Sequence, residues 1–282
     1  MGRAGHGQLI GTPITLAMLG AHTGGHLAVP LRRRFTLGTL RLELIPSGRT
    51  LGAAALHVDI GGRGVLYAGA IRSPGADVRA CDAVVVTAPY GETHHRFRSL
   101  VDVNVEVVAW ARANLSRRPV LVVDTALDGL ELATIVSAAG LAVAGSRAIR
   151  DAALRIGALH SLPPIRAASN RESPSARAGD PSVPRTTTRE PAVTIQLERS
   201  ASAPSALISG RAIDGHAGFD AGFAWPNAAD RKQLLAWIEA TNAREVYVTG
   251  ACAETIVAAL GRRGRLLGPP QQMTLFPREA TR

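Results

Sequence analysis

The chain has 282 residues, of which 46% are hydrophobic and 19% are charged, and its formal net charge is +10. These values are typical of a soluble protein with a real core, built as one large domain or two. Only two cysteines are present, Cys81 and Cys252, and neither belongs to a CxxC motif, so a disulfide framework and a zinc ribbon are both disfavoured.

The N-terminal segment "MGRAGHGQLIGTPITLAML" lacks the basic start, long apolar run and small-residue cleavage site of a secretory signal. No uninterrupted apolar run reaches the roughly 18 residues that a membrane helix needs. We therefore expect a cytoplasmic protein with no membrane partner.

Residues 8–90 are expected to form short strands joined by glycine-rich turns. Leu40, Leu42 and Leu44 alternate with polar residues, which is typical of a strand with one buried face. The "GGRG" at 61–64 is typical of a hairpin turn.

Strands and helices alternate in the next part of the chain. Residues 101–114 have apolar side chains at helical spacing, "RRPVLVVDTA" is typical of a buried strand, and "LDGLELATIVSAAG" is typical of a helix that ends at Gly140. This alternation indicates an α/β arrangement.

The composition changes between residues 162 and 205, where Pro, Ser, Arg and Thr dominate. We expect a mostly disordered linker, in which "AVTIQLE" could form one short edge strand. Order is expected to return with "SALISGRAIDG", a helix in "NAADRKQLLAWIEATNA", the strand "REVYVTGA" and a helix in "AETIVAALGRRG".

The positive charge has two explanations. A basic protein can bind nucleic acid. However, Lys232 is the only lysine among the 32 basic residues, which is also the signature of a GC-rich genome, and the aromatic content of 4% gives no obvious platform for base stacking.

Five motifs occur in an order that resembles the metallo-β-lactamase-fold nucleases with a β-CASP insertion, above all the ligase-associated DNA exonucleases and the mRNA 3′-end-processing-like factors. "GHGQLIGTPITLAML" resembles the segment after the first metal motif of that family. "IPSGRTLGAAALHVDIGGRGVLYAGA" resembles "PAGHxLGSAxV…GxxxxYTGD", and "VVVTAPYG" resembles "LIxExTYG". The segments "ISGRAIDGHAGFDAGFAWPNAAD" and "REVYVTGA" resemble the "SGWA…SDHAD" and "VxxTHG" regions.

The resemblance implies an α/β (α+β) fold, a metallo-β-lactamase-like αββα sandwich that is truncated at its N-terminus and carries a β-CASP-type α/β insertion. The implied division is 1–90 for the first part of the core, 91–161 for the insertion, 162–205 for the linker, 206–265 for the C-terminal part of the core, and 266–282 for a flexible tail.

Enzymes of this family hold two metal ions, usually zinc, with His and Asp side chains. In the resemblance, the "HxHxDH" cluster has no counterpart because the chain begins about where that cluster would end. The other ligand positions correspond to Arg49, Ala70, Thr87, Ala228 and Gly250. None of these side chains is a zinc ligand, so we expect no metal cofactor and no hydrolytic activity. The pair His94 and His95 is interpreted as part of a surface loop.

Arg49 stands where the family has a histidine. A guanidinium is always protonated and would repel a metal ion. It could take over the positive charge of the metal and contact a phosphate; the alternative is a solvated or ion-paired side chain.

The tail contains "QMTLF", which resembles the pentapeptide "QLxLF" that binds the bacterial sliding clamp. The side chains expected to bind are Gln272, Met273, Leu275 and Phe276. A flexible tail that orders on docking gives modest affinity. The alternative is that "MTLF" packs on the domain as a last strand.

Three functions follow from the resemblance. The first is a pseudoenzyme that acts as an adaptor or scaffold in DNA repair or replication, tethered to the clamp. The second is an active metal-dependent nuclease whose ligands come from an upstream segment or a partner chain. The third is an inactive structural subunit of an RNA-processing complex. A sandwich without its first strands would also expose an apolar sheet face or edge, so we expect a homodimer or a partner protein.

Overall fold

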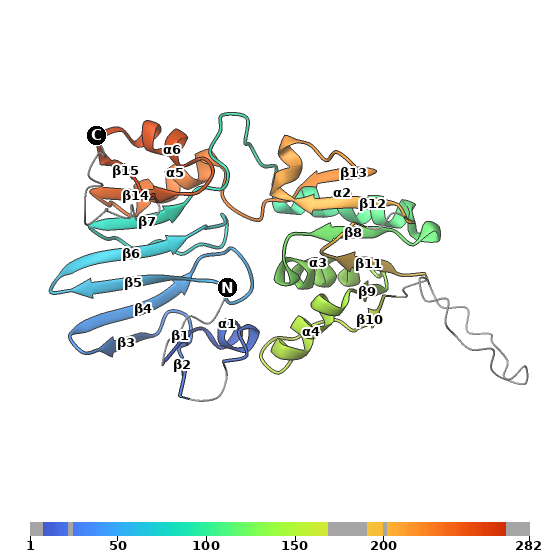
Figure 1. Ribbon diagram of the computed structural model, residues 1–282, viewed down its shortest axis with the longest axis horizontal. Coiled ribbons are helices and arrows are strands. Elements are labelled where there is room, and N and C mark those ends of the chain that lie inside the picture. Colours follow the sequence, from blue (N-terminus) through green and yellow to red (C-terminus); the bar gives the residue numbers. More distant parts are fainter. Residues whose placement is uncertain (1–7, 22–24, 169–190, 200–201, 269–282) are drawn as a thin grey trace, which may run out of the picture.

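The computed structural model describes residues 8–21, 25–168, 191–199 and 202–268, and they form two lobes side by side (Figure 1). One lobe holds a seven-stranded sheet and the other a six-stranded sheet. In Figure 1, strand ends of the two sheets face each other across the middle of the molecule. This mixed α/β architecture agrees with the α/β class expected from the sequence.

The seven-stranded sheet has the order β15-β14-β7-β6-β5-β4-β3. Strands β3 to β6 are antiparallel neighbours, whereas β6, β7, β14 and β15 pair in parallel. Gly61 and Gly62 have positive φ angles and form the tight hairpin between β5 and β6, as "GGRG" predicts. The strands are β3 (Arg34–Leu37), β4 (Leu40–Pro46), β5 (Ala54–Ile60), β6 (Arg63–Gly69), β7 (Ala83–Thr87), β14 (Glu245–Thr249) and β15 (Gly264–Leu266).

Helices α5 (Arg231–Ala240) and α6 (Ala253–Leu260) cover one face of this sheet. Leu234 and Ile238 pack there on Val84 and Val246, and all four are buried. The helix α5 begins at Asp230, whose side chain accepts a hydrogen bond from the backbone N–H of Gln233 while the Gln233 side chain accepts one from the backbone N–H of Asp230. The helix predicted in "NAADRKQLLAWIEATNA" is therefore confirmed, and its Leu235 is only partly buried.

The opposite face of the sheet carries apolar side chains that belong to neither of the two hydrophobic clusters among the described residues. Strand register places Leu56 beside Tyr67, Tyr67 beside Val85, and Val85 beside Tyr247. Tyr67 is 57% exposed and Ile60 is 54% exposed. We call this the open face.

The six-stranded sheet is parallel throughout, with the order β10-β9-β11-β8-β12-β13. All four residues of β8 are buried, as expected for a parallel strand that is covered on both faces. Its helices are α2 (Leu100–Ala113), α3 (Ala126–Ala138) and α4 (Arg147–Ile156). Its strands are β8 (Val120–Val123), β9 (Val143–Gly145), β10 (Ile165–Ala167), β11 (Val193–Gln196), β12 (Ser205–Ser209) and β13 (Ala221–Ala224).

Two sequence-based expectations are wrong in this lobe. Strand β11 was expected at an edge, but it lies between β9 and β8, because its alternating Val193 and Ile195 are fully buried in the core. The C-terminal part of the first lobe was expected to start at residue 206, but β12 and β13 pair with β8 in the second sheet, so the chain returns only after Ala224.

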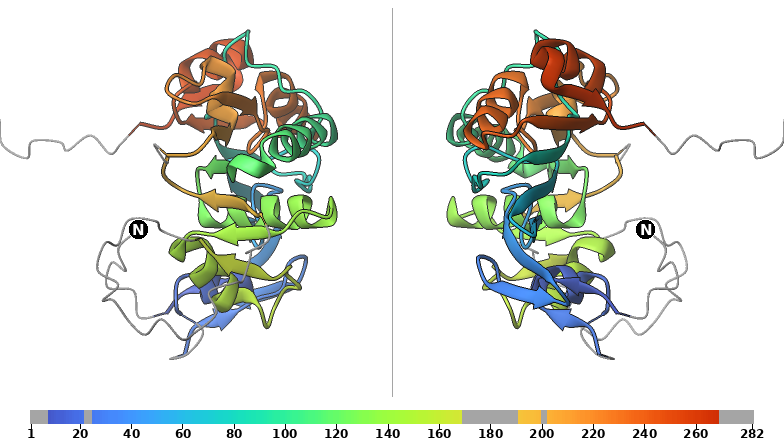
Figure 2. Two further views of the ribbon diagram at one scale, coloured as in Figure 1. Left: turned by 90° about the vertical axis from the view of Figure 1, so that its right-hand side faces the viewer. Right: turned by 90° about the vertical axis from the view of Figure 1, so that its left-hand side faces the viewer.

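A small N-terminal unit connects the lobes. It contains the two-stranded sheet of β1 (Ile10–Gly11) and β2 (Leu27–Ala28) and the helix α1 (Pro13–Met18). The Thr12 hydroxyl donates to the carbonyl of Gly52 in the first lobe, and Arg155 of α4 donates to the carbonyl of Met18. Figure 2 shows the molecule from the outer sides of the six-stranded and seven-stranded lobes in turn. None of the described helices has both the length and the hydropathy required to cross a bilayer.

Candidate functional site

Four of the five positions that the sequence resemblance aligns with metal ligands meet where strands of the first sheet end. Ala70 follows β6, Thr87 ends β7, and Gly250 follows β14. Thr87 is paired with Thr249, which brings it next to Gly250. The loop that contains Ala228 joins them, because the backbone N–H of the next residue donates to the carbonyl of Ile71 at 2.7 Å.

These four positions offer almost no side chain that could hold a metal ion. Ala70, Ala228 and Gly250 have no polar side-chain atom, and Thr87 offers only a hydroxyl. Gly250 has a φ angle of +103°, and a Cβ there would lie 2.9 Å from the carbonyl oxygen of Ala88. The backbone therefore disfavours any side chain at this position, including a histidine.

Arg49 reaches across the gap between the lobes. Its Nη1 donates to Oδ1 of Asp128 at 3.1 Å, and Asp128 is only 1% exposed. The same carboxylate accepts a hydrogen bond from the Thr125 hydroxyl, and both groups lie at the start of α3. The sequence allowed either a phosphate contact or an ion-paired side chain for Arg49. The structure places Arg49 in an ion pair.

A second ion pair crosses the gap close by. Arg72 lies 2.9 Å from Glu131 of α3, and its guanidinium lies 5.8 Å from the ring centroid of Trp225. Burial raises the pKa of Glu131, and the positive charge of Arg72 opposes that rise. The fully buried Trp225 donates its indole N–H to the side-chain oxygen of Asn104 in α2. Two arginines of the first lobe are therefore ion-paired with acidic residues of α3 in the second lobe.

Asp124 is the centre of a third polar group, immediately after β8. Its carboxylate accepts hydrogen bonds from the Ser209 hydroxyl at 2.5 Å, from Nη2 of Arg211 at 2.7 Å, and from Nδ2 of Asn227 at 3.0 Å. The Tyr90 hydroxyl donates to Oδ1 of Asn227 at 3.3 Å. Burial and the charge of Asp124 raise the pKa of Tyr90 to about 12.

The position of Asp124 is the one where parallel sheets bind ligands, outside the carboxyl ends of the strands. Three donors already satisfy its carboxylate, however. Ser209 donates to Asp124, and no histidine is hydrogen-bonded to this serine in the part of the chain that the structure describes. The group therefore links the end of β8 to the end of β12 and to the segment that follows β13.

Sequence reasoning missed this network. Asp124 directly follows the buried strand "PVLVV" in the sequence. Functional side chains often lie at the carboxyl ends of strands in parallel sheets, so this position could have been singled out from the sequence. The partners Ser209 and Asn227 lie 85 and 103 residues further along the chain, and only the fold brings them there.

His94, His95 and Asp214 are the described residues whose ligand atoms lie close enough together for one metal ion. Nε2 of His94 and Nε2 of His95 lie 2.8 Å and 3.1 Å from Oδ1 of Asp214. Nδ1 of His95 accepts hydrogen bonds from the backbone N–H groups of Gly91 and Glu92, which assigns the ring proton to Nε2. A metal-bound histidine normally donates from its other ring nitrogen, so His95 does not fit a metal ligand.

The surface-loop interpretation of this segment is right for His94 and wrong for His95. His94 has 60% of its side chain exposed, whereas 5% of the His95 side chain is exposed. The two backbone N–H groups that point inward draw the His95 ring into the protein, where it makes an edge contact with Tyr90. This histidine is a structural acceptor that links the end of β7 to Asp214.

The residues of the clamp-binding-like motif lie outside the described residues. They are Gln272, Met273, Leu275 and Phe276.

No family model matches this chain, and no curated protein matches it. Solved structures that resemble it include a protein of unknown function from Enterococcus faecalis V583, with a TM-score of 0.62 and 12% sequence identity. That alignment covers 93% of this chain and 74% of the other. At this identity the likeness shows a shared α/β fold.

Proposed function

We propose that this protein is a non-catalytic relative of the β-CASP nucleases, with a degenerate metallo-β-lactamase-like core, and that it works by binding other macromolecules in DNA repair or replication. One observation carries the proposal. Ala70, Thr87, Ala228 and Gly250 meet at one edge and offer no metal-binding side chain, while Arg49 is fastened to the buried Asp128.

The polar groups between the lobes support the same function. In a nuclease, the gap between two lobes has to admit a nucleic-acid strand and keep polar groups free for it. Here, Arg49 and Arg72 of the first lobe are ion-paired with Asp128 and Glu131 of the second, and Asp124 is hydrogen-bonded to Asn227 in the connecting segment after β13. The arrangement favours a rigid scaffold over an open active site.

The tail motif supplies the second part of the proposal, which is the tether. Gln272, Met273, Leu275 and Phe276 resemble the clamp-binding pattern QLxLF, with Met273 in place of its first leucine. A short segment of this kind binds by inserting apolar side chains into a groove, with the glutamine amide at its rim.

The catalytic half of the proposal is tested on the purified protein. We expect substoichiometric zinc by metal analysis, and no loss of a labelled single-stranded DNA in the presence of added Zn²⁺ or Mn²⁺. Bound zinc together with strand cleavage that a chelator abolishes would favour the alternative of an active metal-dependent hydrolase.

The binding half is tested by a pull-down with a bacterial sliding clamp. The variant Leu275→Ala/Phe276→Ala should lose the clamp, because it removes the apolar anchors. Thr274→Ala is the matched control and should bind like wild type, because the third position of the pattern is variable. Equal capture of all three proteins, or capture of none, would reject the tether and leave the metal result unaffected.

A further inference from the structure

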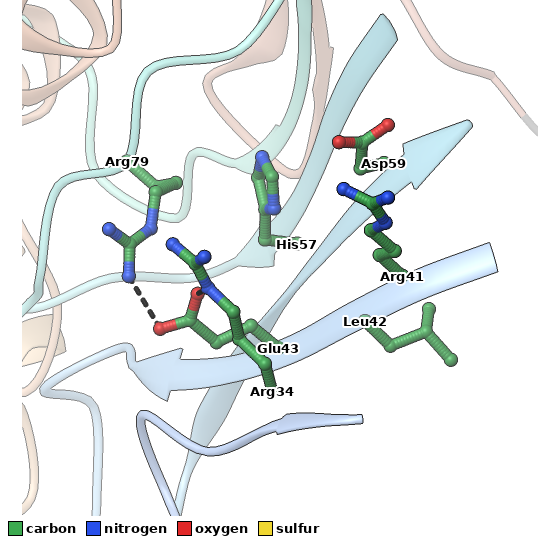
Figure 3. A pocket seen from close by; sticks show the side chains of 7 residues that line it. All are labelled: Arg34, Arg41, Leu42, Glu43, His57, Asp59 and Arg79. Atoms are coloured by element: carbon green, nitrogen blue, oxygen red, sulfur yellow. Dashed lines mark hydrogen bonds and ion pairs between the residues drawn. The ribbon is translucent and has the colours of Figure 1, made fainter. Parts of the chain in front are cut away.

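A small charged hollow lies on the first sheet, away from the gap between the lobes (Figure 3). Its volume is about 130 Å³. Six polar side chains line it, namely Arg34, Arg41, Glu43, His57, Asp59 and Arg79. A hollow of this size is well below the roughly 300 Å³ at which sites for whole cofactors begin. It has room for one small group.

Strand register builds the hollow in two parallel rows. Arg34, Glu43 and His57 are direct neighbours on β3, β4 and β5. Arg41 and Asp59 form the adjacent row. All five side chains share the face that α5 and α6 cover further along the sheet.

Arg79 closes the hollow from the segment between β6 and β7. In Figure 3, its guanidinium and that of Arg34 lie beside Glu43, while that of Arg41 lies next to Asp59 on the other side of His57. Three guanidinium groups from three separate segments therefore meet around one small volume.

The two carboxylates of the hollow already have partners. Glu43 is buried and accepts hydrogen bonds from Arg79 at 2.5 Å and from Arg34 at 3.4 Å. Asp59 accepts a hydrogen bond from the backbone N–H of Gly62 in the hairpin turn. Neither carboxylate is left to balance a further cation.

The guanidinium groups, in contrast, keep N–H donors that have no hydrogen-bond acceptor. Within the described residues, Arg41 is exposed and makes no hydrogen bond or ion pair, and the buried Nε of Arg79 has no hydrogen-bond partner. Arg34 has 80% of its side chain exposed and makes only the long contact to Glu43. Donors are thus in excess of acceptors.

The charge balance points the same way. Three arginines and two carboxylates leave one positive charge. Burial, followed by the charge of Arg79, lowers the pKa of His57, which keeps that ring neutral near pH 7. The hollow therefore lacks one anionic group.

We propose that this hollow binds a single phosphate group. Guanidinium groups are the preferred partners of phosphate because their planar N–H forks match its oxygens. A tetrahedral phosphate can face three guanidinium groups that approach from different directions, whereas a planar carboxylate has only two oxygens in one plane. The phosphate comes either from a small molecule or from a nucleic-acid backbone.

The test is calorimetric titration with inorganic phosphate and, separately, with a short single-stranded DNA, at matched ionic strength. Phosphate should bind more tightly than chloride. Arg41→Ala should weaken binding roughly tenfold, because each charge-assisted hydrogen bond is worth more than a neutral one. The matched control is Arg33→Ala, which removes the same charge from the chain. Arg33 is an exposed neighbour of Arg34 that does not line the hollow.

A second readout comes from His57. A bound anion favours the protonated ring, so phosphate at a concentration that half-fills the wild-type site should raise the His57 pKa measured by NMR in wild type more than in Arg41→Ala. Binding of inorganic phosphate alone identifies a small-molecule source, and DNA binding that Arg41→Ala selectively weakens identifies a backbone source. Equal losses in Arg41→Ala and Arg33→Ala, or no binding of either probe, would overturn the proposal.

Discussion

Arg49 and Asp128 are 79 residues apart in the chain, yet they form an ion pair between the lobes. Removing the guanidinium leaves a buried carboxylate without its counter-ion. We expect Arg49→Ala to lower the free energy of unfolding by about 3 kcal/mol, measured by urea denaturation. Arg33→Ala, an exposed arginine, should change it by less than about 0.5 kcal/mol.

A double variant can show whether Arg49→Ala loses stability because of the unpaired carboxylate or because of lost packing. Asp128→Asn added to Arg49→Ala removes the stranded charge but retains an acceptor for the Thr125 hydroxyl. The double variant should be more stable than Arg49→Ala alone. If it is equally or less stable, the charge was not the reason for the loss.

Tyr90 should make the free energy of unfolding depend on pH in the alkaline range. Burial and the charge of Asp124 raise its pKa from the ordinary 10 to about 12. The unfolded chain therefore loses this proton first, so the contribution of Tyr90 to stability is complete below pH 10 and is lost as the pH rises towards 12. The loss should amount to roughly 2–3 kcal/mol.

The measurement is the free energy of unfolding across this range, compared with Tyr90→Phe. The variant lacks the titrating hydroxyl, so its stability should fall less steeply than that of wild type. Parallel pH profiles would show that other groups cause the alkaline loss.

At the scale of elements, the turn from β14 to α6 depends on Gly250. Its φ angle is +103° and a Cβ would meet the carbonyl oxygen of Ala88 at 2.9 Å. Gly140, after α3, also has a positive φ, but nothing lies within 4 Å of its Cβ position. Gly250→Ala should therefore cost more stability than Gly140→Ala, which carries only the backbone strain of about 1 kcal/mol.

Thermal unfolding of the two variants measures this difference. Gly250→His should be at least as destabilised and should gain no zinc, because Ala70, Thr87 and Ala228 supply no second zinc-binding side chain. A stable, zinc-binding Gly250→His protein would contradict this account of the turn.

Local patterns predict some elements well and others poorly. The apolar spacing of α2, α3 and α5 and the glycine at Gly140 gave their positions directly. Helix α4 was not predicted, although Ile149, Ala152 and Ile156 have helical spacing and are buried. The central place of β11 could not be predicted, because an alternating strand of four residues looks the same at an edge and in the middle of a sheet.

At the scale of the whole molecule, the open face predicts association. From β4 to β14, the side chains that register places on this face include one oppositely charged pair, Arg63 and Glu245, which lie 3.4 Å apart. Arg265 of β15 lies next to Tyr247 at the rim of this face and adds one positive charge there. The centre of the face is apolar, so two copies can meet there despite a net charge of +10 each. We expect a homodimer.

Light scattering tests this expectation. Tyr67→Asp should convert the dimer into a monomer, because it places a charge at the centre of the face. Val101→Asp is the control: Val101 is 72% exposed on α2, in the other lobe, and should leave the dimer intact. A monodisperse wild-type monomer would count against the association.

The sequence by itself determined the α/β class, most helices and hairpins, and the five residues that its resemblance to metal-dependent nucleases places at ligand positions. These are properties of local periodicity and of side-chain chemistry, which can be read without knowing the neighbours. Tertiary structure decided that Arg49 pairs with Asp128, that Asp124 gathers Ser209 and Asn227, and that three arginines surround one hollow. Contacts of this kind join strands and loops far apart in the chain, and no local pattern encodes which partner each charged side chain will meet.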